Sequence, residues 1–388
     1  MANDPTVNIT KFLGLYNKQQ SRRLPVGALT VVENVDIDDT DGIVRRQGYQ
    51  SKLSLPNVTS AFATQDQRRC FVISDGNLLF LQEDLSYTSL ASGLSTEFVY
   101  WEEVADYVLL STGHVIDGDN QVSMWRIDSP PQPKVTLSTG DLREGQYQVA
   151  VTYVDSLGRE GGASPVVVLN INAGEAITVT PNMGNYSLAR VYCTEANGSQ
   201  LYLAGETATA ITLATDSSLV SPIEADQLGA FPAPAQAQIL AHYDGRLFAA
   251  EPGNGVSIVW FSVPYWWNLF KLQSDFFTVP GDIRSIVSHS DGLIIGTDDE
   301  IYVYNGSLTR VAKYGVPDGV PATKDDTGTV FLWTKQGLCS ALPFTNLTSQ
   351  KCSLPTGNVC TSAVVEQNGF RKVVVLTDAE GTADNQLL

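Results

Sequence analysis

Residues 284–306 read RSIVSHSDGLIIGTDDEIYVYNG and contain two short apolar runs separated by an acidic turn. Leu293 to Ile295 form the first run and Ile301 to Tyr304 the second, with Asp298, Asp299 and Glu300 near the turn between them. Asn305 and Gly306 follow, and because both residue types tolerate a positive φ, this pair is a strong turn signal. Two β-rich runs joined by a polar turn predict an antiparallel hairpin.

The same pattern of a β-rich run next to a turn occurs six times along the chain. The second apolar residues of the six runs are Val72, Leu109, Phe248, Ile295, Leu332 and Val375. Successive members of this series are 37, 139, 47, 37 and 43 residues apart. Four spacings are near 40, and the fifth equals one repeat plus an insertion of about 100 residues. A period of about 40 residues with several short strands per repeat predicts a β-propeller of about five to six blades.

The composition favours an all-β protein. Charged residues make up 17% of the 388 residues, and 32 Gly and 18 Pro accompany an almost complete lack of helical periodicity. Abundant turn residues between short apolar runs are typical of sandwiches and propellers. The net charge of −18, from 24 basic and 42 acidic side chains, argues against unspecific binding of nucleic acid, which requires clustered Lys and Arg.

Neither a disulfide framework nor a membrane segment is predicted. The five cysteines are odd in number and scattered, and none has the spacing of a zinc site. The first residues lack an apolar signal core, and no apolar span reaches 18 residues, so we expect no membrane insertion.

Proline-rich segments divide the chain. Residues 1–27 are polar and predict an N-terminal arm, and residues 28–128 predict the first part of the propeller. After the segment SPPQP, residues 134–228 carry about seven short strands with clean alternation, which predicts an inserted β-sandwich of the immunoglobulin or fibronectin-III type. Residues 236–388 predict the second part of the propeller. We also expect the hairpin at 28–49 to pair with the last blade, because closure removes exposed strand edges.

Three stretches resemble virion proteins of tailed bacteriophages. The first is the pattern FLGL, LPVGA, ENVD and RRQGY between Phe12 and Tyr49, and the second is Tyr147–Tyr153 with Arg190–Gly198. The third runs from Trp266 to Gly306. Together they resemble the tail-nozzle, or packaged-DNA-stabilisation, proteins of short-tailed phages, although this chain is shorter than many of them. A propeller from the tail of a long-tailed phage stays open as well.

The resemblance implies a structural protein made in the host cytoplasm and located in the virion tail. It implies a homomeric ring, usually a hexamer, that contacts other tail or head–tail connector proteins. DNA passes through such a ring, which helps to retain or release the genome without reading its sequence. An anionic wall suits this role, because it repels the DNA backbone.

Six residues are candidate interface contacts. Arg22, Arg23, Arg45 and Arg46 are either solvated charges or contacts to an acidic neighbouring subunit. Trp266 and Trp267 are either core residues or anchors of an interface, because Trp contributes strongly to interface energy.

Candidate chemistry is sparse. The Asp298–Glu300 cluster fits either a hydrolytic or metal-binding site or a solvated turn, and the aspartates from Asp36 to Asp41 fit either a calcium loop or a hairpin turn. The three histidines are His114, His242 and His289, far apart in sequence. No nucleotide, hydrolase or zinc-protease motif is present. We therefore expect no enzyme activity, cofactor or metal; the alternatives are a carbohydrate-binding propeller module and a glycan hydrolase.

Overall fold

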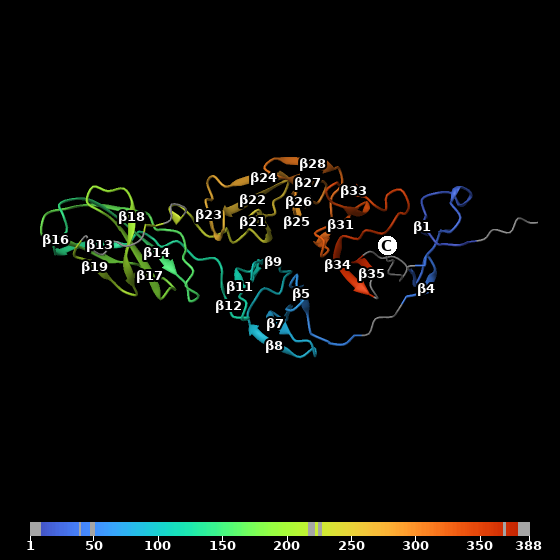
Figure 1. The fold of residues 1–388 in the computed structure, drawn as a ribbon, viewed down its shortest axis with the longest axis horizontal. Coiled ribbons are helices and arrows are strands. Elements are labelled where there is room, and N and C mark those ends of the chain that lie inside the picture. Colours follow the sequence, from blue (N-terminus) through green and yellow to red (C-terminus); the bar gives the residue numbers. More distant parts are fainter. Residues whose placement is uncertain are drawn as a thin grey trace, which may run out of the picture.

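The computed structural model describes residues 9–38, 40–46, 51–215, 222–223, 227–367 and 370–378 (Figure 1). Within these residues the chain forms strands β1 to β35 and one short 3-10 helix, η1 (Ser21–Arg23). The predicted all-β class is confirmed.

Five stretches of the chain each fold into an antiparallel sheet in which consecutive strands pair, except that β24 of the third sheet pairs with β22. The first sheet contains β5 (Val58–Ala63), β6 (Cys70–Ser74), β7 (Asn77–Leu81) and β8 (Tyr87–Ala91). The second contains β9 (Trp101–Val104), β10 (Tyr107–Leu110), β11 (His114–Ile116) and β12 (Val122–Met124). The third contains β20 (Ile239–Tyr243), β21 (Arg246–Glu251), β22 (Val256–Val263), β23 (Trp266–Phe270) and β24 (Phe276–Pro280).

The fourth sheet contains β25 (Ile283–His289), β26 (Gly292–Thr297), β27 (Ile301–Tyr304) and β28 (Leu308–Ala312). The fifth contains β30 (Ala322–Lys324), β31 (Val330–Thr334), β32 (Gly337–Ser340) and β33 (Thr345–Asn346). A sixth sheet has three strands and a different topology, because β29 (Asp318–Val320) pairs in parallel with β34 (Val359–Gln367), which pairs with β35 (Phe370–Thr377).

Successive sheets pack face to face in chain order. Five clusters of buried apolar side chains join the first sheet to the second, the second to the third, and so on to the sixth. The first strands β9, β20 and β25 contact one another in turn, and β25 also contacts β29 and β30. Sheets stacked side by side with their first strands together are the arrangement of a β-propeller. No such cluster joins the sixth sheet to the first among the described residues.

This stacking explains why the second strand of each sheet gave the clearest sequence signal. A sheet packed between two others buries both faces of its inner strands, so β26 is buried at all six positions and reads as a continuous apolar run. The predicted hairpin is present, with Leu293 paired to Tyr304 and Gly296 to Ile301. Gly296 is required here, because a Cβ at this position would lie 2.8 Å from the side chain of Val316.

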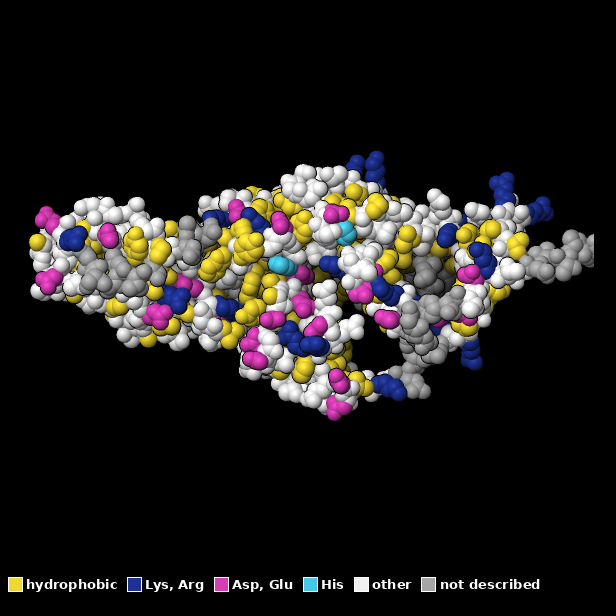
Figure 2. Space-filling view, in the orientation of Figure 1, with side chains coloured by type: hydrophobic (Ala, Val, Ile, Leu, Met, Phe, Trp, Pro, Cys, Tyr) yellow, Lys and Arg dark blue, Asp and Glu magenta, His cyan; other side chains and the backbone are white. Residues whose placement is uncertain are grey.

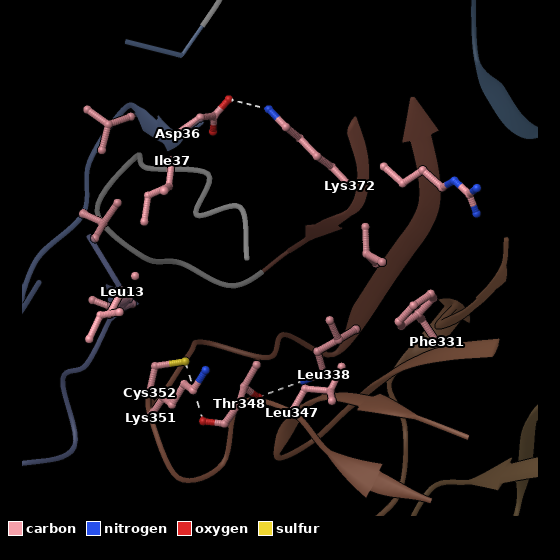
Figure 3. Close-up of a pocket in the computed structure, with 16 residues that line it drawn as sticks. Leu13, Asp36, Ile37, Phe331, Leu338, Leu347, Thr348, Lys351, Cys352 and Lys372 are labelled. Carbon is pink, nitrogen blue, oxygen red and sulfur yellow. Dashed lines mark hydrogen bonds and ion pairs between the residues drawn. The ribbon is translucent and has the colours of Figure 1, made fainter. Parts of the chain in front are cut away.

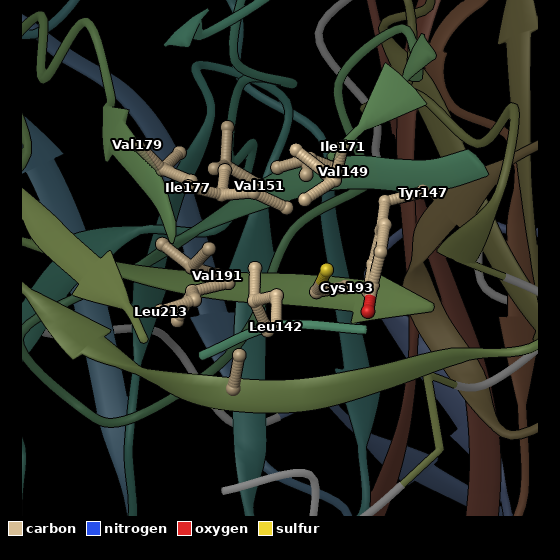
Figure 4. Close-up of a cluster of buried hydrophobic side chains, with 11 residues drawn as sticks. Leu142, Tyr147, Val149, Val151, Ile171, Ile177, Val179, Val191, Cys193 and Leu213 are labelled. Atoms are coloured by element: carbon tan, nitrogen blue, oxygen red, sulfur yellow. The ribbon is translucent and has the colours of Figure 1, made fainter. Parts of the chain in front are cut away.

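Residues 134–213 form two antiparallel sheets at one end of the molecule, at the left of Figure 1. One has the order β13 (Lys134–Thr139), β16 (Glu175–Thr180), β19 (Ile211–Leu213), and the other β15 (Val167–Ile171), β14 (Gly145–Val154), β17 (Leu188–Thr194), β18 (Leu201–Thr207). They share one core, in which Tyr147, Val149 and Val151 of β14 face Ile177, Val179 and Leu213 (Figure 4).

The N-terminal residues form a small structure at the opposite end of the molecule (Figure 1). β1 (Gly14–Leu15) pairs in parallel with β2 (Ala28–Leu29), and β3 (Val35–Ile37) forms a hairpin with β4 (Ile43–Arg45). The expected pairing of this hairpin with the last sheet is absent from the described residues; residues 47–50 lie outside them. The link to β35 is instead an ion pair from Lys372 to Asp36 of 2.9 Å.

Candidate functional site

The candidate arginines at the N-terminus have different surroundings. Arg22 and Arg23 lie on η1 with exposed side chains, and neither forms an ion pair within the described residues. Arg45 is exposed at the end of β4. Arg46 is different, because its Nε donates to Oδ1 of Asp36 over 3.2 Å and its side chain is only 8% exposed. Arg46 is thus tied to its own hairpin.

The predicted arm spans residues 1–27, and the described residues 9–32, called the arm below, are the most cationic part of the chain. It contains Lys11, Lys18, Arg22 and Arg23 and no Asp or Glu. It is attached to the loop after β33, where Nζ of Lys18 donates to the carbonyl of Ser349 over 2.7 Å. Figure 2 shows Lys and Arg side chains projecting into solvent at this end of the molecule.

A glycine allows the arm to fold back on itself. The N–H of Leu13 donates to the carbonyl of Gly27 over 2.8 Å, which brings the two ends of the arm together. Gly27 has a φ of +91°, and a Cβ there would lie 2.1 Å from the carbonyl oxygen of Lys11. Only glycine fits this approach.

A cavity of about 490 Å³ lies between the arm, the β3–β4 hairpin and the last two sheets (Figure 3). Leu13 and Ile37 line one side, and Phe331 and Leu338 the other. Lys372 reaches across its rim to Asp36. Asp36 accepts hydrogen bonds from Lys372 and Arg46. Burial acts to raise the pKa of Asp36, but these two bonds outweigh it and lower the pKa below its usual value.

A second pocket, of about 270 Å³, lies where the inserted sheets meet the propeller; we call it the junction pocket. Trp266, Trp267 and Asn268 of β23 line it from the propeller, with Tyr107 and Tyr265. From the insertion, the lining residues are Gly158, Arg159, Glu160 and Arg190. The sequence singled out the two tryptophans, although as interface candidates, and gave no sign of the pocket residues from the insertion.

Trp267 is both a packing residue and a wall of this pocket. Its ring centroid is 5.5 Å from that of Tyr107 and 6.4 Å from that of Trp125, and the guanidinium of Arg159 lies 5.3 Å from it. Arg159 is fixed in place by Asp155 and by the carbonyl of Met124. Trp267 therefore packs within the protein, and its predicted role as an interface anchor stays a prediction.

Glu160 is the central carboxylate of the junction pocket. It is 8% exposed and accepts hydrogen bonds from Thr152, from Tyr192 over 2.7 Å and from Arg190 over 2.7 Å. Burial, followed by the bond to Glu160, raises the pKa of Tyr192. The bond to Glu206 is the main cause of the raised pKa of Arg190, with Glu160 contributing.

A third cluster of charged residues lies where the first strands of several sheets meet. Oε1 of Glu102 accepts a bond from the N–H of His242 over 2.8 Å. Burial raises the pKa of Glu102 to about 8, against the effects of His242 and Lys324. Nearby, Arg284 pairs with Asp282 and Asp318, and burial raises the pKa of Tyr100 to about 12.

Carboxylates that the sequence offered as hydrolytic or metal-binding candidates accept hydrogen bonds within turns and hairpins. Glu300 accepts from Tyr302 and pairs with Arg310 over 2.6 Å, and Oδ1 of Asp298 accepts from the N–H of Asp282. Oδ1 of Asp38 accepts from Thr40 and Gly42 inside its hairpin. In the described part of the chain, no three His, Cys, Asp or Glu side chains are grouped as metal ligands.

The described helix is far too short to cross a membrane, and no membrane-spanning helix is found among the described residues.

Comparison with known proteins gives likenesses of low sequence identity to solved structures. No protein-family model matches the chain, and the search of curated proteins finds no match. Among solved structures, virginiamycin B lyase from Staphylococcus aureus is 9% identical, with a TM-score of 0.34 over 83% of this chain and 92% of that one. The Dos1 propeller is 8% identical, with a TM-score of 0.35 over 90% and 79%. Hsv2 from Kluyveromyces marxianus is 11% identical, with a TM-score of 0.29 over 83% and 89%. These neighbours are β-propellers, and at such TM-scores the likeness carries no argument about activity.

Proposed function

We propose that this chain is a structural virion protein of a bacteriophage tail, whose copies join into a ring that extends the DNA conduit. In this proposal the protomer is a six-bladed propeller carrying an inserted sandwich of the fibronectin-III type. The partners are further copies of the chain and other tail proteins, and DNA passes through the ring without being read.

The observation that carries this proposal is the separation of charge between the arm and the rest of the chain. Four of the 24 basic residues and none of the 42 acidic ones fall between residues 9 and 32. Arg22 and Arg23 lie there without a partner among the described residues, although acidic side chains are abundant elsewhere. Two exposed arginines without a partner among the described residues, on an otherwise acidic protein, are suited to bind the acidic surface of another copy.

Exposed apolar residues at the same place support a contact. Val26 and Val31 of the arm are 60% and 67% exposed, and Val44 of the adjacent hairpin is 41% exposed. Apolar side chains with arginine between them are typical of the centre of a protein interface. A ring also requires two different surfaces on each copy, and an arm and its acceptor meet this requirement.

The test is the assembly state of the purified full chain, measured by mass photometry and negative-stain electron microscopy. We expect a discrete ring for the unaltered chain and mainly single protomers for the double variant Arg22→Glu, Arg23→Glu. The matched control reverses two other exposed cations, Arg68→Glu and Lys335→Glu, and should leave the ring intact. A monomer at all concentrations, or an intact ring in the arm variant, would contradict the proposal.

A further inference from the structure

The junction pocket has the composition of a binding site for an uncharged polar ligand. Its walls combine four aromatic residues with planar polar side chains, as in small-molecule pockets where apolar surface gives affinity and a few polar groups give orientation. We propose that this pocket binds one neutral saccharide unit, stacked between Tyr265 and Trp266 and hydrogen-bonded to Arg190 and Asn268. This binding is independent of ring assembly.

Tyr265 lies with its ring against Gly245, where a Cβ would come within 3.0 Å of it, and leaves the other face of the ring uncovered. Its side chain is 87% exposed, yet its backbone has a φ of +64°, which is strained for a residue with a bulky side chain. The N–H of Tyr265 donates to the carbonyl of Gly245 over 2.7 Å, which fixes the turn between β22 and β23. The fold thus presents an aromatic face to solvent at the rim of the pocket.

The polar side chains of the pocket are held by the protein and keep unused hydrogen-bonding atoms. Nδ2 of Asn268 donates to the carbonyl of Glu160 over 3.0 Å, while its Oδ1 has no donor among the described residues. Arg190 uses Nη1 for Glu160 and Nε for Glu206, at 2.7 and 2.9 Å. Its Nη2 forms no bond in the described part of the chain. One fixed acceptor and one fixed donor suit the hydroxyl groups of a sugar.

The charges around the pocket disfavour ionic ligands. A cation would compete with the guanidinium of Arg159, which already occupies one face of Trp267 at 5.3 Å. An anion would find both arginines paired with carboxylates, Arg159 with Asp155 and Arg190 with Glu160 and Glu206. Nη1 of Arg159 is buried without a partner among the described residues and is a further donor for a hydroxyl group. A sugar ring carries no charge and offers a C–H face to an aromatic ring and hydroxyl groups at its edge. The volume of about 270 Å³ limits the ligand to about one such ring.

The experiment is saturation-transfer NMR on the full chain with three probes, the methyl glycosides of glucose, galactose and N-acetylglucosamine. We expect transfer to at least one of them, with a dissociation constant in the millimolar range, as is usual for so small a ligand. Neither choline nor inorganic sulfate should displace it. Absence of transfer to all three glycosides, or displacement by either ion, overturns the proposal.

Two variants assign the binding to this pocket. Tyr265→Gly removes the aromatic ring and relieves the positive φ, so folding is preserved, and we expect binding to weaken about tenfold or more. The control Tyr87→Ala removes another exposed aromatic ring, on β8, and should bind as the unaltered chain does. Equal binding by Tyr265→Gly and the unaltered chain means that the sugar binds elsewhere, which also overturns the proposal.

Discussion

At the scale of single residues, Glu102 is a carboxylate whose charge opposes folding. Burial raises its pKa from an ordinary value of 4.5 to about 8, so the folded chain binds a proton that the unfolded chain has released between these pH values. The free energy of unfolding must then fall as pH rises from about 5 to about 8, and this loss is complete above the raised pKa.

We predict that Glu102→Gln removes this pH dependence. The variant should match the unaltered chain near pH 5 and exceed it by roughly 2 to 4 kcal/mol near pH 9, because Gln keeps the acceptor for the N–H of His242 without a charge. Urea unfolding at the two pH values measures the difference. A gain of the same size at both pH values would show that the charge of Glu102 has no part in it.

Glu160 is a buried carboxylate with three hydrogen-bond donors. We predict that Glu160→Ala lowers the free energy of unfolding by about 3 kcal/mol, because Arg190, Tyr192 and Thr152 lose their common acceptor. Chemical denaturation of the full chain measures this. The control is Glu206→Ala, since Glu206 pairs with the same arginine but is 44% exposed, and its loss should cost less than about 1 kcal/mol.

At the scale of elements, the arm depends on the close approach of Gly27 to Lys11. We predict that Gly27→Ala releases the arm and leaves the propeller folded, since the contact at 2.1 Å involves backbone on both sides and cannot relax locally. Trypsin should then cleave at Lys18, Arg22 and Arg23 faster, while the main thermal transition stays in place. Gly14→Ala separates clash from backbone strain, because Gly14 lies in the same arm with a φ of +90° but has open space where a Cβ would lie. Faster cleavage in both variants would assign the effect to something other than this contact.

The elements also show what could be predicted from the sequence. Val72, Leu109, Phe248, Ile295 and Leu332 lie on β6, β10, β21, β26 and β31, each the second strand of its sheet. Val375 lies on β35, the third strand of the sixth sheet, because β29 enters this sheet from a position before the fifth. The spacing of 43 residues between Leu332 and Val375 could not show that a strand from before the fifth sheet joins the sixth.

The junction pocket shows why the candidate site was only partly predictable. Trp266 and Trp267 are conspicuous as a pair of large aromatic residues, and both line the pocket. Glu160 and Arg190 lie far from them in sequence, on the inserted sheets, and only the packing of the insertion on β23 brings them together. Arg46 could not be separated from Arg45 by composition, since the register of the β3–β4 hairpin decides which of them meets Asp36.

At the scale of the whole molecule, the insertion leaves and re-enters the propeller at neighbouring points. The hydroxyl of Ser129 donates to the carbonyl of Ala230 over 2.9 Å, although 101 residues separate them. The sheets of the insertion have their own core, and the six stacked sheets have theirs. The two are joined by Arg159, which lies over Trp267 and donates to Ser123 and to the carbonyl of Met124. Asn268 donates to the carbonyl of Glu160, and Ile127 packs against Tyr153 and Ala189 of the insertion.

We therefore predict that replacing residues 131–228 by a short Gly-Ser linker leaves a propeller that unfolds cooperatively. Its melting temperature should be a few degrees lower, because Trp267 loses the cover of Arg159, and any saccharide binding should disappear with the pocket. Circular dichroism and differential scanning calorimetry test this, with the excised segment produced separately as a control that should also fold. If the shortened chain has no cooperative transition, the insertion is part of the propeller's folding unit, and the two cores do not form independently.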